Sequence, residues 1–312
     1  MLLSTIMRFH KRERLPFLEN AISSLATQDW PALEVVVMLQ NPDEALLREV
    51  EQIILRQPWP TSPRFQVVAV EVPAGVDGRS ELLNQGLDRA TGRFVAFLDD
   101  DDIIYPYGYK TLVGQLLAGN SVVAVGGYCK AYLRREADGW RVVAREDSVV
   151  PEPSRLTLFR YNYVPIHSYI IDRSRLGSFK LYFDNDFPPL EDYDFLLRLF
   201  AVFEADFSQF ETLVCEYRIH ELNSIGYSLD KPDEQSPALQ RAQGLIAERK
   251  KTLPCVITVG ELAELTGELV RLSGERERLL QRLARRMHDA VDSRPQLKSR
   301  LRNAQAWCFK KS

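Results

Sequence analysis

The chain has 312 residues, of which 45% are hydrophobic and 27% are charged, a composition that is typical of globular proteins and excludes a disordered chain or a small disulfide-stapled scaffold. The formal net charge of −3 argues against nucleic-acid binding, although the charge is unevenly distributed. Residues 271–312 hold 12 Lys and Arg against 4 Asp and Glu, a net charge of +8, so the rest of the chain carries −11.

The first 130 residues alternate between strand-like and helix-like patterns. Short apolar runs predict four buried strands, at residues 2–7, 33–39, 65–70 and 94–98. Apolar residues at helical spacing predict three helices between them, at residues 15–28, 44–55 and 80–90. This alternation predicts an α/β fold, in which helices cover both faces of a sheet.

The middle of the chain is less regular. Residues 121–134 are predicted to form one or two strands, and residues 140–144 a hairpin partner. An amphipathic helix is expected at 194–205 and a further strand at 212–218. We therefore expect one catalytic domain over residues 1–230.

The C-terminal part has a different pattern. Residues 231–258 contain three prolines around a short helical segment and are interpreted as a connector. From Leu262 to Leu283, leucines recur at heptad positions, which predicts a helical tail over 259–312 that forms a short coiled coil or a docking helix. Residues 259–291 could join two copies of the chain or contact an assembly partner, and the basic end could lie against an anionic membrane. The alternative is a solvated helix packed back on the catalytic domain.

Two features bear on location. The four cysteines are widely spaced and form no CxxC pair, which favours a reducing compartment. The N-terminal charges follow a short apolar stretch, the reverse of a secretory signal, and no apolar run reaches the 18 or so residues of a membrane span. The sequence therefore predicts a cytoplasmic protein, peripheral at the inner face of the membrane if the basic tail binds lipid.

Four consecutive carboxylates stand at the end of an apolar run in the segment FVAFLDDDD, residues 94–102. Ligands of open α/β sheets bind at the carboxyl ends of strands. Packed carboxylates repel one another unless a cation lies among them, and a hard divalent ion is commonly held by one or two carboxylates plus substrate phosphates. The simpler interpretation, a helix N-cap with exposed acids, accounts for one Asp but not for four.

A second acidic segment, PPLEDYD at residues 188–194, leads into the apolar sequence FLLRLF. Acids at the start of a helix cap free N–H groups and complement the helix dipole, which is a purely structural interpretation. Glu191 and Asp192 could also place a general base beside a bound acceptor, and one carboxylate can serve both purposes.

Two further segments carry groups that could contact an anion. Arg218 and His220, in YRIHELNS, follow a predicted strand and could meet diphosphate oxygens or a metal, although a lone histidine is more often structural. In GVDGRS, Gly75 and Gly78 lead to Arg79 near a helix start, a position that suits an anion, but such glycine turns are common.

Taken together and in order, ATGRFVAFLDDDD, EDYDFLLRL and YRIHELNS resemble the family-2 inverting glycosyltransferases of the GT-A fold. The resemblance covers residues 1–228. It implies a mixed GT-A sheet flanked by helices, a nucleoside-diphosphate sugar as donor, and Mn2+ or Mg2+ as cofactor. The tail also resembles helical linkers of bacterial polysaccharide-assembly glycosyltransferases, which implies a glycan or lipid-linked acceptor.

The same resemblance assigns roles to the acids. Asp99 and Asp101 would be the DxD pair that holds the metal and the donor diphosphate, with Asp102 as a further metal ligand and Asp100 at the donor. In the second segment the base that deprotonates the acceptor hydroxyl would be Asp192.

The remaining assignments concern the partners of these acids. Glu191 would contact the acceptor, and His220 would join the metal ligands. Arg218 would face the diphosphate, while Arg79 and Asn84 would line the nucleotide pocket.

One stretch departs from the family. After the second strand the family usually has an acidic segment whose Asp reads the base of the nucleotide, whereas this chain has Gln40 and Asn41. Their amides could still bond a base edge, so UDP cannot be assumed as the carrier. The first loop, FHKRERLPFL, resembles that of the family and places Arg8, His10 and Arg12 near the donor.

Two other functions are weighed against metal-dependent inverting sugar transfer. A nucleotidyltransferase acting on sugar phosphates would use a similar sheet, but its N-terminal phosphate loop is rich in glycine and lysine, and LLSTIMRFHKRER has no glycine. A non-catalytic sugar-nucleotide-binding module would not need every carboxylate that the reaction requires.

Overall fold

The computed structural model describes residues 1–137, 139–221 and 237–265. The chain divides into two compact units, Met1–Val256 and Ile257–Ser312. Within the second unit, only residues 257–265 are described, and residues 259–265 are helical.

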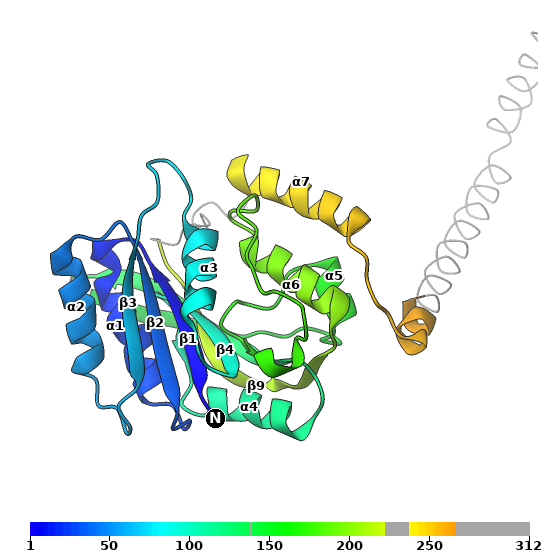
Figure 1. Cartoon of the computed structure of the whole chain (residues 1–312), viewed down its shortest axis with the longest axis horizontal. Coiled ribbons are helices and arrows are strands. Elements are labelled where there is room, and N and C mark those ends of the chain that lie inside the picture. Colours follow the sequence, from blue (N-terminus) through cyan, green and yellow to red (C-terminus); the bar gives the residue numbers. More distant parts are fainter. Residues whose placement is uncertain (138, 222–236, 266–312) are drawn as a thin grey trace, which may run out of the picture. The chain divides into compact units, whose positions relative to one another are not determined.

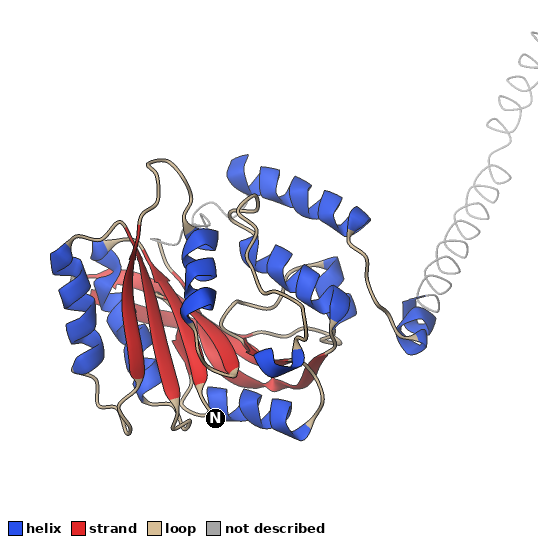
Figure 2. Ribbon diagram, viewed as in Figure 1, coloured by secondary structure: helices blue, strands red, loops and turns tan. Residues whose placement is uncertain are grey.

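A mixed sheet forms the centre of the first unit, with nine strands in the described residues (Figures 1 and 2). Their order is β3-β2-β1-β4-β8-β6-β9-β5, and β7 pairs with β6. The parallel part is β1 Leu3–Phe9, β2 Leu33–Gln40, β3 Arg64–Val70 and β4 Phe94–Asp99. The mixed part is β5 Ile103–Ile104, β6 Val123–Glu136, β7 Gly139–Asp147, β8 Tyr169–Asp172 and β9 Ala205–Ile219.

Helices cover both faces of this sheet, because side chains of successive strand residues point to opposite faces. One face packs against α1 Leu15–Ala26, α2 Glu44–Leu55 and α4 Gly108–Ala118. The other packs against α3 Arg79–Arg89, α5 Arg155–Arg160, α6 Glu191–Val202 and α7 Pro237–Thr252. Two 3₁₀ turns, η1 Arg12–Arg14 and η2 Arg173–Arg175, complete the elements. This arrangement confirms the predicted α/β fold.

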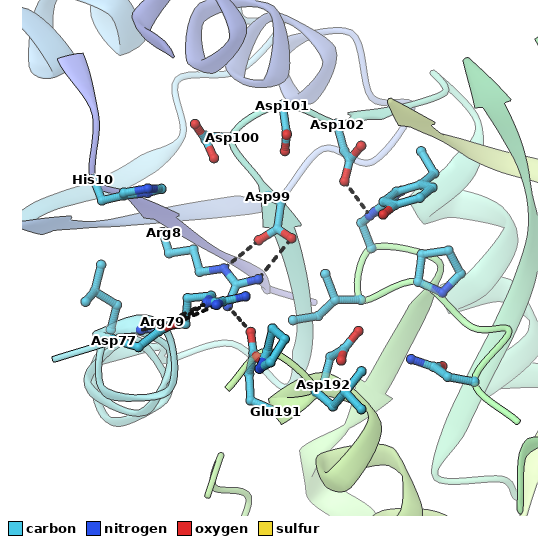
Figure 3. A pocket seen from close by; sticks show the side chains of 18 of the residues that line it. Arg8, His10, Asp77, Arg79, Asp99, Asp100, Asp101, Asp102, Glu191 and Asp192 are labelled. Carbon is cyan, nitrogen blue, oxygen red and sulfur yellow. Dashed lines mark hydrogen bonds and ion pairs between the residues drawn. The ribbon is translucent and has the colours of Figure 1, made fainter. Parts of the chain in front are cut away.

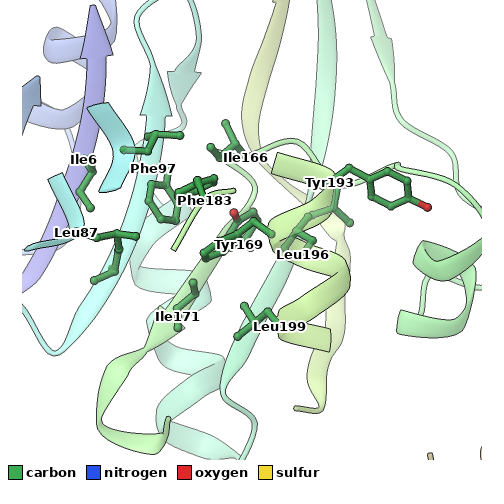
Figure 4. Close-up of a cluster of buried hydrophobic side chains, with 14 of the residues drawn as sticks. Ile6, Leu87, Phe97, Ile166, Tyr169, Ile171, Phe183, Tyr193, Leu196 and Leu199 are labelled. Carbon is green, nitrogen blue, oxygen red and sulfur yellow. The ribbon is translucent and has the colours of Figure 1, made fainter. Parts of the chain in front are cut away.

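The core on the α3 and α6 face holds both helices against the sheet. Leu87 of α3 and Leu196 of α6 are buried in one cluster with Ile6 and Phe97 of the sheet (Figure 4). Each buried side chain of this size contributes about 1.5–3 kcal/mol. Gly86 lets α3 approach β1 closely, because a Cβ at this position would overlap the side chain of Ile6.

Most of the predicted elements are confirmed. The seven elements of the first 98 residues end within two residues of their predicted bounds, and β7 is the antiparallel partner of β6. The helix predicted at 194–205 instead begins at Glu191 and ends at Val202, because the acidic residues form its first turn. The strand predicted at 212–218 begins at Ala205, where β9 joins β6 through register shifts that alternation of apolar residues does not reveal.

The segment interpreted as a connector contains a helix of 16 residues, α7. It packs against α6 and buries Ala242 and Ile246. The guanidinium of Arg249 lies 2.6 Å from Asp184 and 3.0 Å from Asp194. Residues through Val256 thus belong to the first compact unit.

The expected heptads and basic end fall mostly on residues 266–312, which lie outside the described residues. The coiled coil, the docking role and the membrane contact of residues 259–312 therefore stay predictions. In the described part of the chain, no helix has both the length and the apolar composition that crossing a bilayer requires.

Candidate active site

A cavity of about 830 Å³ lies at the carboxyl ends of β1, β2 and β4 (Figure 3). This is the edge at which open α/β sheets bind their ligands. Its lining includes the following residues proposed from the sequence: Arg8, His10, Gln40, Arg79, Asp99, Asp100, Asp101, Asp102, Glu191 and Asp192. The fold thus brings together side chains that are up to 184 positions apart in the sequence.

Arg8 joins the two acidic segments. It lies beside Asp99 in the register of β1 and β4. Its Nε and Nη2 donate to the two carboxylate oxygens of Asp99, at 2.7 and 3.1 Å, and its Nη1 donates to Glu191 Oε1 at 2.5 Å (Figure 3). A guanidinium suits this position because it presents several donors in one rigid plane. Arg8 therefore positions α6 against the end of β4.

The other three acids of the turn are buried, and each has a polar contact. Asp100 and Asp101 contact the guanidinium of Arg14, with Nε 2.8 Å from Asp100 Oδ2 and Nη2 2.6 Å from Asp101 Oδ2. The backbone N–H of Arg218 donates to Asp102 Oδ1 at 2.7 Å. Burial, followed by the charge of Asp101, raises the pKa of both Asp100 and Asp102 well above the usual range. A cation among these carboxyl groups would offset their mutual repulsion and favour their ionised forms.

Two histidines lie against this turn. His220 Nε2 is 3.0 Å from Asp101 Oδ2, and its ring stacks on Phe17 at 4.4 Å. His167 Nδ1 is 3.1 Å from Asp102 Oδ2, and burial lowers the pKa of His167 to about 4. At neutral pH His167 is consequently uncharged and does not neutralise Asp102.

Asp192 presents a carboxylate to the cavity from the first turn of α6 (Figure 3). Its Oδ1 accepts a hydrogen bond of 2.7 Å from the backbone N–H of Tyr193. Burial, and then the nearby charge of Glu191, raise the pKa of Asp192 to about 7. A pKa near the operating pH is what general-base catalysis requires.

One side of the cavity offers polar groups for a nucleotide. Arg79 begins α3, and its Nε donates to Asp77 Oδ1 at 2.9 Å. Gln40, at the end of β2, and His10 line the same side. Burial, and then the charge of Arg14, lower the pKa of His10 to about 4, so this ring is neutral and can exchange hydrogen bonds without carrying charge.

Two residues that the sequence placed near the nucleotide do not line the cavity. Asn41 spans the ends of β2 and β3: its Nδ2 donates to Val72 O and its Oδ1 accepts from Val72 N, both at 2.8 Å. Asn84 links α3 to the backbone of Phe183. Its Nδ2 donates to Phe183 O at 2.9 Å, and its Oδ1 accepts from Phe183 N at 2.7 Å. Both amides therefore hold backbone segments in place.

Replacement of Asn84 by Ala should lower the free energy of unfolding by about 2 kcal/mol, because it leaves two buried backbone groups of Phe183 without partners. Nucleotide affinity should stay unchanged. Chemical denaturation and calorimetry test both expectations, with the exposed Asn20→Ala on α1 as control. A stable variant with weakened nucleotide binding would contradict this structural role.

Three more candidates stand at or outside the margin of the cavity. Arg218 and His220 are absent from the lining, although both reach the acid turn through the contacts described above. Arg12 is exposed and pairs with Asp43 and Glu49 at 2.7 and 2.9 Å. The structure thus brings Arg218 and His220 into contact with the acids of the turn and pairs Arg12 with residues of α2 and its N-cap.

Several lining residues were not proposed from the sequence. Arg14 and Asp77 lie two positions from the proposed residues Arg12 and Arg79, and the basic run HKRER and the motif VDGR were the available signals. The far side of the cavity comprises Tyr128, Lys130, Tyr132, Asn162, Tyr217, Leu239 and Gln243. Alternation along β6 places Tyr128, Lys130 and Tyr132 on one face. No local pattern could have indicated this side, because four separate segments form it.

The residues present fit a hard divalent cation only in part. Carboxylates are the preferred protein ligands of Mg2+ and Mn2+. Asp101 Oδ2 and His220 Nε2 are 3.0 Å apart, close to the separation of about 3 Å between adjacent ligands in an octahedral site. Among the described residues, however, no group of three or more His, Cys, Asp or Glu is arranged to hold an ion. An ion here would need further ligands, such as diphosphate oxygens.

Comparisons with known proteins match this chain to glycosyltransferases. The model of the family "Glycosyl transferase family 2" matches residues 4–169. An uncharacterized glycosyltransferase of Haemophilus influenzae is 22% identical over 229 residues, which cover 70% of this chain and 66% of the relative. The GalNAc(5)-diNAcBac-PP-undecaprenol beta-1,3-glucosyltransferase of Campylobacter jejuni is 30% identical over 127 residues, 41% of this chain and 38% of the relative. The chain thus spans less than two thirds of either relative.

Among solved structures, TarS residues 1–349 of S. aureus in complex with UDP-GlcNAc superposes with a TM-score of 0.57 at 18% identity. The superposition covers 84% of this chain and 69% of the other. At this identity the likeness concerns the fold, a mixed sheet flanked by helices.

Proposed function

The chain belongs to glycosyl transferase family 2, and from this premise we propose that it transfers a sugar from a nucleoside-diphosphate sugar to an acceptor hydroxyl, with inversion at the anomeric carbon. The observation that carries the proposal is a single cavity lined by Arg79, by the acids after β4 and by Asp192. Side chains that can bind an anionic donor and a carboxylate that can act as general base therefore line the same cavity.

The donor would occupy the side of the cavity formed by β1, β2 and α3. Gln40 and Asp77 would face the nucleoside, and Arg79 would meet the diphosphate beside the helix start, where backbone N–H groups favour anions. That the S. aureus neighbour holds UDP-GlcNAc supports this class of donor. The amide of Gln40 offers both a hydrogen-bond donor and an acceptor to the edge of a nucleobase. Which nucleobase the donor carries is therefore left to binding measurements.

A divalent ion is part of the proposal. Asp101 and His220 would hold it, with Asp99 and Asp102 close by, and when bound it would offset the charge that grows on the leaving diphosphate. Arg8 keeps Asp99 and Glu191 in place around the reacting centre. These contacts organise the site before the donor arrives, which is how electrostatic stabilisation becomes effective.

Asp192 would remove the proton from the acceptor hydroxyl as that oxygen attacks the anomeric carbon. Attack from the face opposite the diphosphate inverts the configuration. Glu191 Oε2 is buried without a hydrogen-bond partner, so it can accept a hydrogen bond from an acceptor hydroxyl. The two acids at the start of α6 would therefore divide the work: Asp192 takes the proton and Glu191 orients the acceptor.

The acceptor would lie on the far side of the cavity. Tyr128, Tyr132 and Tyr217 offer ring faces and edges there, and Lys130 offers a cation. The name of the Campylobacter relative describes a lipid-diphosphate-linked glycan acceptor, which supports a glycan or lipid-linked acceptor of the kind used in surface polysaccharide synthesis. The predictions of a cytoplasmic location and of a partner for the tail belong to this proposal.

The turnover number should fall as the pH drops below about 7, by about tenfold for each pH unit. The reason is that the raised pKa of Asp192 lies near 7, and only the ionised carboxylate can accept a proton. Above this pKa the rate should reach a plateau. Initial rates at saturating donor and acceptor between pH 5 and 9 test this, and a rate independent of pH from 5 to 7 would contradict the assignment.

Product analysis tests the reaction class. Sugar transfer releases a nucleoside diphosphate, whereas a nucleotidyltransferase would exchange pyrophosphate. UDP-GlcNAc and GDP-mannose with Mn2+ should each be assayed by chromatography for the released nucleotide, with and without acceptor oligosaccharides. Nucleoside diphosphate as the product supports the proposal. Formation of a nucleoside triphosphate and a sugar 1-phosphate when pyrophosphate is added to the sugar nucleotide would reassign the enzyme as a nucleotidyltransferase, and binding without turnover would favour a non-catalytic module.

A further inference from the structure

Arg14 occupies the place at the acid turn where a cation is needed. It ends η1, and its side chain is only 4% exposed. Its guanidinium spans two consecutive carboxylates, with Nε 2.8 Å from Asp100 Oδ2 and Nη2 2.6 Å from Asp101 Oδ2. A fixed cation in this position compensates two buried charges that would otherwise repel each other.

The contact involves the oxygen that a metal would use. Asp101 Oδ2 is bound by Arg14 and also lies 3.0 Å from His220 Nε2. An ion coordinated by Asp101 Oδ2 and His220 would occupy space next to a guanidinium of the same sign. Arg14 and the ion therefore compete for one carboxylate oxygen.

We propose that Arg14 is a positioning residue that stands in for the divalent cation when no donor is bound and keeps the affinity for free metal low. This inference rests on the metal-dependent part of the proposed function. Because Arg14 also lines the cavity, an arriving diphosphate offers its guanidinium a second anionic partner. The ion and the donor diphosphate are then expected to bind together.

The charges around the turn support this role. Four aspartates are opposed by two arginines in direct contact, Arg8 on Asp99 and Arg14 on the next two acids. Removing the charge of Arg14 would leave Asp100 and Asp101 buried without a guanidinium, and Asp101 would keep its contact with His220. Such a site is both less stable and more attractive to any cation that can enter it.

The experiment uses the full chain and Mn2+ alone. Isothermal titration with Mn2+ in the absence of nucleotide should show weak binding to the wild type and at least about tenfold tighter binding to Arg14→Gln. Arg12→Gln is the matched control, since Arg12 lies two positions away but is exposed and contacts none of these acids. Arg14→Lys keeps the charge and should restore the weak binding of the wild type.

A second readout follows from linkage. Mn2+ should raise the thermal midpoint of Arg14→Gln more than that of the wild type, because the ion replaces the lost counter-charge. If Arg14→Gln does not fold, the double variant Arg14→Gln/Asp100→Asn replaces it. This variant removes the carboxylate of Asp100 together with the guanidinium of Arg14 and leaves Asp101 intact. This double variant should bind Mn2+ more tightly than Asp100→Asn alone.

The possible outcomes distinguish a failure of the role of Arg14 from a failure of the proposed metal dependence. Equal Mn2+ affinity in the wild type and the Arg14 variants, with Mn2+ still binding the wild type in the presence of UDP or GDP, would overturn the role of Arg14 only. Absence of Mn2+ binding in every variant, with and without nucleotide, would reject the metal-dependent site itself. Tighter binding in Arg14→Gln that Arg14→Lys reverses supports the proposal.

Discussion

Asp192→Asn is expected to lower the turnover number by about 10²–10⁴-fold while leaving donor affinity unchanged. The amide has nearly the same shape as the carboxylate and can still accept the hydrogen bond from Tyr193 N, but it cannot take a proton from the acceptor. The loss should therefore appear in the chemical step. Steady-state rates and calorimetric titration with the donor separate the two effects.

The control for this variant is Asp186→Asn. Asp186 is exposed and precedes α6 by a few residues, so the same change of charge is made close to the site without touching the cavity lining. It should keep the wild-type rate. Full activity in Asp192→Asn would remove this residue from the role of base and leave Glu191 as the acid to test next.

Asp101→Ala is the second change with a large expected effect. Mn2+ should no longer strengthen donor binding, a loss of at least about tenfold in affinity, because Asp101 provides the oxygen that faces His220. Titrations of the donor with and without Mn2+ measure the difference directly. The exposed Asp88→Asn on α3 is the control and should keep the full effect of Mn2+.

Stability must be followed in the same variant. Arg14 keeps its contact with Asp100 when Asp101 is removed, so Arg14 retains one of its two ion pairs with the turn, and the pair of Arg8 with Asp99 is untouched. The thermal midpoint should fall by only a few degrees, and a folded protein that still shows stronger donor binding with Mn2+ would contradict the assignment of Asp101 as a metal ligand.

The sequence was most informative where local patterns decide the structure. Apolar runs and helical spacing located the elements of the first 98 residues, because parallel strands buried on both faces give continuous apolar segments. It was less informative for β9, where a polar stretch from Ala205 onward pairs with β6 through irregular register. No pattern within the strand encodes such pairing, because the partner strand determines it.

The site residues were likewise predictable where they follow a recognisable element and unpredictable where a long-range contact places them. The acids after β4 and at the start of α6 could be identified because chemistry-bearing residues follow recognisable elements. The contacts of Arg8 and Arg14 with these acids arise only from the register of β1 with β4 and from the turn after it. Asn84, which was expected at the nucleotide, instead holds the backbone of Phe183, a long-range contact that sequence spacing cannot reveal.

The most direct test of the account is a crystal structure of the full chain with Mn2+ and an intact sugar nucleotide, with the ion located by its anomalous scattering. The account predicts the diphosphate in the cavity beside Arg79, an ion bound to Asp101, and the transferable sugar facing Asp192. A nucleotide bound elsewhere, or one bound in the cavity while Asp101 still pairs with Arg14 and no ion is present, would contradict it.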